Sequence, residues 1–167
     1  MLPVLTLRSK APEQTRELAA ALAPMLAPGD VVALSGELGA GKTCFVQGAA
    51  RALGVHDRVT SPTFTLVRTY PEADVPIVHC DVYRLDRLQD VLDLGDEVLA
   101  PDVVTFVEWG DAVASLLPDD RLDVELTLAD DEDLDGDRLV RLRPTGPHWQ
   151  RRLEDLADAC AAWRVEG

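Results

Sequence analysis

The segment from Val31 to Thr43 reads VVALSGELGAGKT, and it constrains the fold more than any other part of this 167-residue chain. The continuous apolar run VVALS is typical of a strand buried inside an α/β sheet. A helical pattern begins at Lys42 and continues to Leu53, where Gly54 ends it. Between the two, GELGAGKT matches the phosphate-loop spacing G-x-x-x-x-G-K-[ST]. A strand, a glycine-rich loop and a helix in this order predict a phosphate site on an α/β sheet.

The chemistry of that loop requires these residue types. Glycines let the backbone fold around phosphates with several N–H groups pointing inward, and the helix N-terminus adds the positive end of its dipole. Lys42 is one of only two lysines in the chain, and it stands where the motif needs a cation for the β- and γ-phosphates; the Thr43 hydroxyl is a ligand for Mg²⁺. The expected nucleotide-binding residues are Gly36, Glu37, Leu38, Gly39, Ala40, Gly41, Lys42, Thr43 and Cys44.

Hydrophobic periodicity predicts a single α/β domain over 1–167, a P-loop NTPase-like three-layer sandwich with a mixed parallel and antiparallel sheet. Strands are expected over 3–9, 31–35, 63–70, 76–85, 103–109, 122–128 and 138–144. Helices are expected over 12–27, 42–53, 86–94 and about 147–163. The strands 63–70 and 76–85 are predicted to pair with each other, and 122–128 and 138–144 to form a hairpin that belongs, with the last helix, to the same domain.

Two carboxylates stand at predicted strand ends, where open α/β sheets bind ligands. Glu108 ends VVTFVE and is the natural counterpart of a Walker-B acid, which orients the attacking water or supports Mg²⁺. Asp81, in HCDVYR, is a candidate metal ligand, directly or through water. Taken alone, either residue is more often an ordinary surface carboxylate that follows a strand. The phosphate loop in the same small domain favours a role for both at the nucleotide site.

The segment VTSPT places three hydroxyls, those of Thr60, Ser61 and Thr63, around a proline. In nucleotide switches such a segment senses the γ-phosphate. A plain turn before a strand accounts for the same spacing equally well. We therefore keep these three residues as switch candidates.

The sequence also bears on which nucleotide binds. Proteins that recognise guanine through an N/T-K-x-D element need a lysine outside the phosphate loop. The only such lysine, Lys10, is followed by Ala-Pro and does not match the element, so ATP is favoured over GTP. A small-molecule or nucleoside kinase remains an alternative, with Arg68, Arg84 and Arg87 as lid candidates, although no arginine-rich insertion is present. A nucleotide-gated scaffold without significant turnover, in which Glu108 is structural, is a second alternative.

The net charge and the cysteines indicate which partners and which compartment to expect. A net charge of −14 repels a nucleic-acid backbone, so independent binding to DNA or RNA is not expected, whereas a basic partner surface would be attracted. Three scattered cysteines without a C-x-x-C pair fit a reducing compartment. Because no signal peptide or membrane span is recognisable, we expect a cytoplasmic protein.

One acidic segment imitates a metal loop. Asp131, Asp133, Asp135 and Gly136 match the opening of an EF-hand, but the twelfth position is Leu142 rather than glutamate. The loop 129–137 is therefore expected to be a solvated hairpin connection.

Four motifs occur in one order: SGELGAGKT (35–43), VTSPTFTLV (59–67), HCDVYRL (79–85) and VEWGD (107–111). Together they closely resemble the TsaE (YjeE) family of bacterial ATPases required for threonylcarbamoyladenosine formation on tRNA. The resemblance covers most of the chain, and the combination is far more specific than the phosphate loop alone. One departure is Gly110, where the family often has proline.

The resemblance implies an ATP and Mg²⁺ site with weak intrinsic hydrolysis. It assigns phosphate and metal contacts to Lys42 and Thr43, metal support to Asp81, catalysis to Glu108 and a place beside the nucleotide to Trp109. It also implies protein partners, the TsaB–TsaD heterodimer, whose TsaD subunit transfers the threonylcarbamoyl group to position 37 of tRNA. Contact with tRNA would then be indirect, through that complex.

Overall fold

The structure is a computed structural model of the chain, and it describes residues 4–36, 40–56, 59, 67–81, 100–108, 117–129 and 136–165. The helix expected over 86–94 lies outside the described residues. So do residues 63–66 and 82–85 of two predicted strands. The strand before the phosphate loop, the helix after it and both candidate carboxylates are described.

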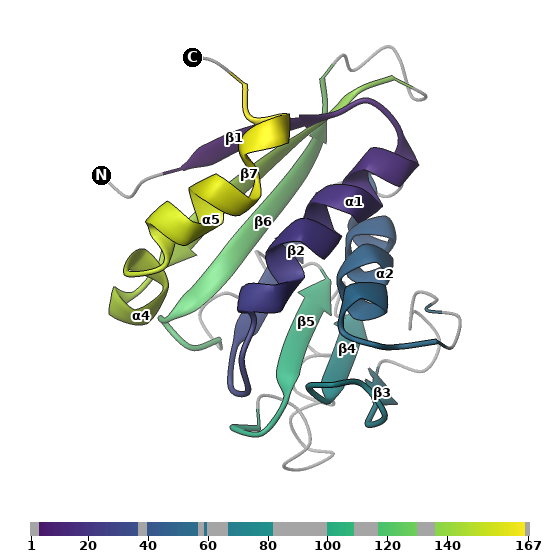
Figure 1. The fold of residues 1–167 in the computed structure, drawn as a ribbon, viewed down its shortest axis with the longest axis vertical. Coiled ribbons are helices and arrows are strands. Elements are labelled where there is room, and N and C mark those ends of the chain that lie inside the picture. The colour runs from purple at the N-terminus through teal and green to yellow at the C-terminus, as the bar shows by residue number, and fades with distance from the viewer. Residues whose placement is uncertain are drawn as a thin grey trace.

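The described strands form one seven-stranded sheet in the order β1-β7-β6-β2-β5-β4-β3 (Figure 1). The strands are β1 (Leu5–Ser9), β2 (Val31–Ser35), β3 (Val67–Tyr70), β4 (Ile77–Asp81), β5 (Val104–Glu108), β6 (Arg121–Leu128) and β7 (Arg138–Thr145). β2 lies between β5 and β6 and is parallel to both, and β4 is parallel to β5. β3 pairs antiparallel with β4, and β7 pairs antiparallel with β6 and β1. The mixed sheet and both predicted strand pairs are therefore confirmed.

Burial explains why the central strands have continuous apolar runs. All five residues of β4 and of β5 are buried, as are the first four of β2. In β6, by contrast, buried residues alternate with partly exposed ones over most of the strand. A strand covered on both faces favours apolar residues at successive positions, whereas a strand covered on one face favours them at every second position. The buried polar residues of β4 and β5, which include Asp81 and Glu108, depart from this pattern.

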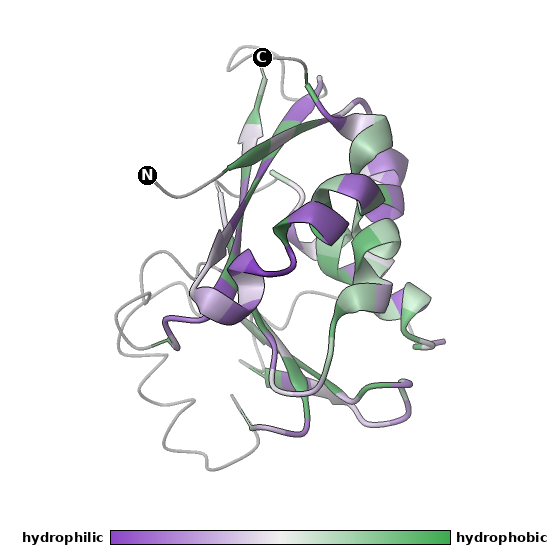
Figure 2. Ribbon diagram, turned by 60° about the vertical axis from the view of Figure 1, so that its left-hand side comes forward, coloured by the Kyte–Doolittle hydropathy of each residue, from purple (hydrophilic) through white to green (hydrophobic). Residues whose placement is uncertain are grey.

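The described helices lie on one face of the sheet (Figures 1 and 2). They are α1 (Pro12–Leu22), η1 (Ala23–Met25), α2 (Lys42–Ala52), α4 (Pro147–Gln150), α5 (Leu153–Ala159) and η3 (Ala161–Trp163). On the opposite face the central strands are buried as well, at positions such as Ala33, Cys80 and Val107, as the predicted three-layer arrangement requires. Within the described part of the chain, no helix is long and apolar enough to cross a membrane.

The C-terminal helix differs from the expectation. Instead of one helix over about 147–163, the chain forms α4, a turn, α5 and η3. Arg152 lies at the turn, and its guanidinium makes a bidentate ion pair with the buried Asp30, at 2.6 and 3.0 Å. The same guanidinium stacks over the ring of Trp149, 4.4 Å from its centroid. These tertiary contacts accompany the break, whereas the sequence periodicity alone predicts a continuous helix.

Candidate functional site

The phosphate loop is anchored to the sheet through its first glycine. Gly36 follows β2 with a φ of 142°, and a Cβ atom at this position would lie only 2.3 Å from the carbonyl oxygen of Leu126 in β6. At the other end of the loop, Gly41 adopts a φ of 108° as the N-cap of α2 and has no side-chain capping hydrogen bond. Only glycine takes up both conformations without strain. The two motif glycines are therefore required by the backbone path.

Lys42 is turned back onto its own loop. Its side chain is buried, with 5% exposed, although an ammonium group is costly to bury without polar contacts. Nζ donates a hydrogen bond of 2.6 Å to the carbonyl oxygen of Gly36. The cation is thus held at the loop, at the first turn of α2, where the helix dipole also favours an anion.

Thr43, Glu108 and His79 form a hydrogen-bonded chain from α2 into the sheet. The Thr43 hydroxyl donates to Glu108, at 3.2 Å to Oε1 and 3.5 Å to Oε2. His79 Nε2 lies 2.5 Å from Glu108 Oε2, and both side chains are almost fully buried. An ionised carboxylate only accepts hydrogen bonds, so with an ionised Glu108 the proton is on Nε2. These hydrogen bonds fix the orientation of the Glu108 carboxylate next to the phosphate loop.

Asp81 lies beside Glu108 in the sheet. The two residues are direct partners in the parallel pairing of β4 and β5, and both are buried, with 4% and 3% exposed. Direct partners point to the same face, which is the face covered by α2. Thr43, Glu108 and Asp81 carry side-chain oxygens of the hard type that Mg²⁺ prefers, and they are the residues that could hold such an ion together with phosphate oxygens. In the described part of the chain, no group of three His, Cys, Asp or Glu side chains has metal-binding geometry.

Comparison with known proteins identifies the family of the chain. The family model for the threonylcarbamoyl adenosine biosynthesis protein TsaE matches residues 9–138. The chain belongs to the TsaE family. Relatives named tRNA threonylcarbamoyladenosine biosynthesis protein TsaE include one from Bacillus subtilis, 36% identical over 90% of this chain and 92% of its own length. Another, from Streptomyces coelicolor, is 42% identical over 80% of this chain and 93% of its own length.

A solved structure extends the likeness to the fold. The crystal structure of Bacillus subtilis YdiB superposes with a TM-score of 0.78 at 32% sequence identity, covering 95% of this chain and 97% of that one. The P-loop-like α/β fold predicted from the sequence is thereby confirmed. The segment matched by the TsaE family model also contains all four motifs that carry the sequence resemblance.

Several residues that the sequence singled out fall outside the described residues. They are Glu37, Leu38 and Gly39 of the loop, the switch candidates Thr60, Ser61 and Thr63, Trp109, and the lid candidates of the alternative kinase, Arg84 and Arg87. Ala40 is buried just before α2, and Cys44 is half-buried in the first turn of α2. Arg68 is exposed on the edge strand β3. Leu142, the residue that disqualified a calcium loop, is buried in β7.

The sequence did not single out His79 as a site residue. Its imidazole is fully buried and contacts Glu108, while Nδ1 has no hydrogen-bond partner within the described part of the structure. A signal was nevertheless present, because His79 and Asp81 are two residues apart on one strand and therefore share a face. A histidine on that face, next to the strand that carries Glu108, is well placed to touch the carboxylate.

The three cysteines of this TsaE-family chain should differ sharply in reactivity. Burial, and to a lesser degree the charge of Asp81, raises the pKa of the Cys80 thiol to about 12. Burial alone raises that of Cys160 to about 11. A raised pKa means less of the reactive thiolate at a given pH. At pH 8 we expect one fast reaction with a disulfide reagent, at the half-buried Cys44, and two slow ones.

The measurement is the number of fast-reacting thiols in the native protein, counted by absorbance. The Cys44→Ser variant is expected to lose the fast phase, and denaturant should expose all three thiols. Two or more fast thiols in the native protein would contradict the burial of Cys80 and Cys160.

Proposed function

We propose that this chain binds ATP with Mg²⁺ and hydrolyses it slowly, as an accessory subunit of the machinery that forms threonylcarbamoyladenosine on tRNA. The observation that carries the proposal is the contact of Thr43 with Glu108, which joins the phosphate loop to a carboxylate at the end of β5. The pathway comes from the relatives, which are named tRNA threonylcarbamoyladenosine biosynthesis protein TsaE. The assignment of the site residues rests on their geometry and on the family motifs.

In this proposal each described residue has one task. Lys42 Nζ transfers from the Gly36 carbonyl to the β- and γ-phosphates, and the first-turn amides of α2 bind phosphate oxygens. Thr43 and Glu108, with Asp81 directly or through water, hold Mg²⁺, which when bound neutralises phosphate charge.

The role of Glu108 goes beyond metal support. Its carboxylate orients the attacking water, and the hydrogen bond with His79 limits the directions in which it can point. No acceptor other than water is needed in such a reaction. The slow turnover expected for the isolated chain agrees with a site that a partner completes.

The protein partners in this proposal are TsaB and TsaD, and tRNA is contacted only through them. The acidity of the chain agrees with that arrangement, because a net charge of −14 disfavours direct contact with a nucleic-acid backbone. Such a role also places the protein in the cytoplasm, where tRNA is modified.

Two measurements test the proposal together. With γ-labelled ATP, the label should appear as inorganic phosphate, whereas a kinase would place it on an added nucleoside or other small acceptor. Association with purified TsaB–TsaD should be stronger with ATP and Mg²⁺ than without, because a nucleotide switch requires differential affinity. Labelled acceptor would replace the ATPase with a kinase, and equal affinity with and without ATP would contradict the switch.

A further inference from the structure

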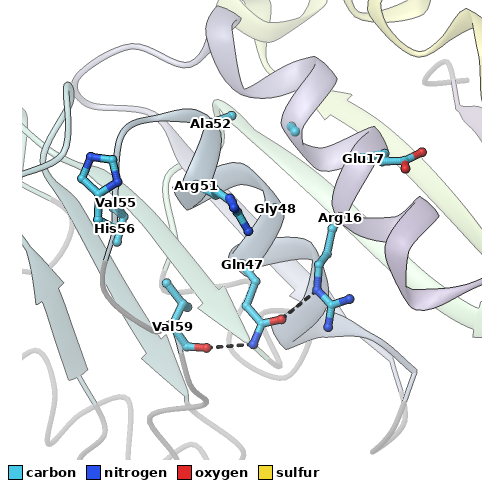
Figure 3. Close-up of a pocket in the computed structure, with 10 residues that line it drawn as sticks. Arg16, Glu17, Gln47, Gly48, Arg51, Ala52, Val55, His56 and Val59 are labelled. Carbon is cyan, nitrogen blue, oxygen red and sulfur yellow. Dashed lines mark hydrogen bonds between the residues drawn. The ribbon is translucent and has the colours of Figure 1, made fainter.

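A groove separate from the phosphate loop lies on the outer side of the two long helices (Figure 3). We call it the α1–α2 groove. It is bounded by α1, the second half of α2 and the segment that follows α2, and its volume is about 600 Å³. Its principal lining residues are Arg16, Gln47, Gly48, Arg51, Val55 and Val59. None of the residues that we place at the nucleotide site lines it.

The two helices that bound the groove are in contact with each other. A Cβ atom on Gly48 would lie 2.1 Å from the carbonyl oxygen of Arg16, so the backbones of α1 and α2 are in direct contact. Small residues, Ala20 and Ala52, line the groove beside this contact. Val55 and Val59 also line the groove, with 3% and 5% of each residue exposed. The volume is within the range of pockets that hold a ligand or a few side chains.

The charge in the groove is opposite to that of the protein. Arg16, Arg51 and Glu17 give the lining a net charge of +1 with His56 neutral, in a chain whose net charge is −14. In Figure 3 the Glu17 carboxylate points away from Gln47 and Arg51. Arg51 is exposed, and within the described part of the chain its guanidinium makes no hydrogen bond or ion pair. The Arg51 guanidinium is therefore available to pair with an anionic group that enters the groove.

Arg16 is already oriented for such a contact. Its Nε donates to Gln47 Oε1 at 3.1 Å, and the amide of the same Gln47 donates to the Val59 carbonyl at 2.8 Å (Figure 3). Among the described residues, the remaining guanidinium nitrogens have only a long approach to Glu13, 3.8 Å between exposed groups, which contributes little. A guanidinium held at one nitrogen loses less rotamer entropy when a carboxylate binds the others.

We propose that the α1–α2 groove binds an acidic segment of a partner protein, with a carboxylate on Arg16 and Arg51 and an adjacent apolar side chain against Val55 and Val59. A carboxylate matches the planar donors of a guanidinium. A protein segment fits this groove better than a nucleic acid does. A nucleic-acid backbone needs an extended basic surface, whereas the groove has only two arginines beside apolar residues, and the negative charge of the whole protein repels phosphates.

The test uses the full chain, isotope-labelled, and two capped peptides observed through its amide NMR signals. The probe is acetyl-Leu-Glu-Glu-Leu-amide, and the control peptide has glutamine in place of both glutamates. The glutamate peptide should shift the amides of Gln47, Gly48 and Arg51 in a saturable way at concentrations up to about 1 mM, the weak end of the affinity scale. The glutamine peptide should not.

Variants separate the groove from general charge effects. Arg51→Glu should weaken glutamate-peptide binding about tenfold or more, since it replaces attraction by repulsion. Arg143→Glu is the matched control, because Arg143 is an exposed arginine on β7, and it should change the affinity less than about twofold. No nucleotide is present, so the outcome is independent of the proposed ATPase function.

Four results would overturn the proposal: no saturable shifts, equal binding of the glutamine peptide, equal weakening by both charge variants, or tighter binding of a single-stranded RNA oligonucleotide to the same amides in an Arg51-dependent way. The last result would assign the groove to nucleic acid. Unchanged amide spectra of Arg51→Glu away from the groove should accompany the expected loss, which shows that the variant is folded.

Discussion

Replacing Lys42 with alanine is expected to abolish ATP binding. The ammonium group is buried at the loop and donates to the Gly36 carbonyl, from which it reaches the phosphate position at the start of α2. Removing one partner of a buried, hydrogen-bonded charge pair costs about 2–5 kcal/mol, so the affinity should fall roughly 30-fold to several-thousand-fold. Isothermal titration of the purified chain with ATP and Mg²⁺ measures the loss.

The chain provides its own control for this variant. Lys10, the only other lysine, is exposed between β1 and α1, and Lys10→Ala should bind ATP as the unmodified chain does. Thermal unfolding of both variants distinguishes lost affinity from lost folding. Wild-type affinity in a folded Lys42→Ala variant would mean that GELGAGKT does not bind the phosphates in the way its spacing indicates.

Replacing Glu108 with alanine is expected to leave ATP binding in place and to remove hydrolysis. The carboxylate lies at the end of β5, held between the Thr43 hydroxyl and the His79 imidazole. A group that positions water and takes part in proton transfer typically contributes a factor of about 10²–10⁴ to the rate. Release of phosphate from saturating ATP should fall by roughly that factor, while the dissociation constant changes much less.

Two further variants sharpen the result. Glu108→Gln keeps the shape and one acceptor oxygen for His79, so it should fold well and still be inactive if the carboxylate charge is needed. Glu125→Gln removes a surface carboxylate on β6 that pairs with Arg141 at 3.0 Å, and it should leave turnover unchanged. Unchanged phosphate release in both Glu108 variants would remove Glu108 from catalysis and favour a nucleotide-gated scaffold.

Local pattern was enough to predict most of the elements. The VVALS run, the alternation in β6 and the breaker residues after α2 each reflect constraints that act within a few residues of the chain. The C-terminal helix shows the limit of such reasoning. Its periodicity is continuous, but Arg152 pairs with Asp30, more than 100 residues earlier, and the chain turns there. A contact between distant residues leaves no trace in local periodicity.

The sequence by itself determined the phosphate loop, the strand before it and the helix after it, because glycine positions and residue spacing directly dictate that geometry. It also identified Glu108 and Asp81 as residues at strand ends. Only the tertiary structure joined Thr43 to Glu108 and Glu108 to the buried His79, since these contacts depend on β4, β5 and α2 being neighbours in space. The α1–α2 groove has the same origin. Its arginines are 35 positions apart in the sequence, and they line one groove because α1 and α2 lie side by side, in contact at Gly48.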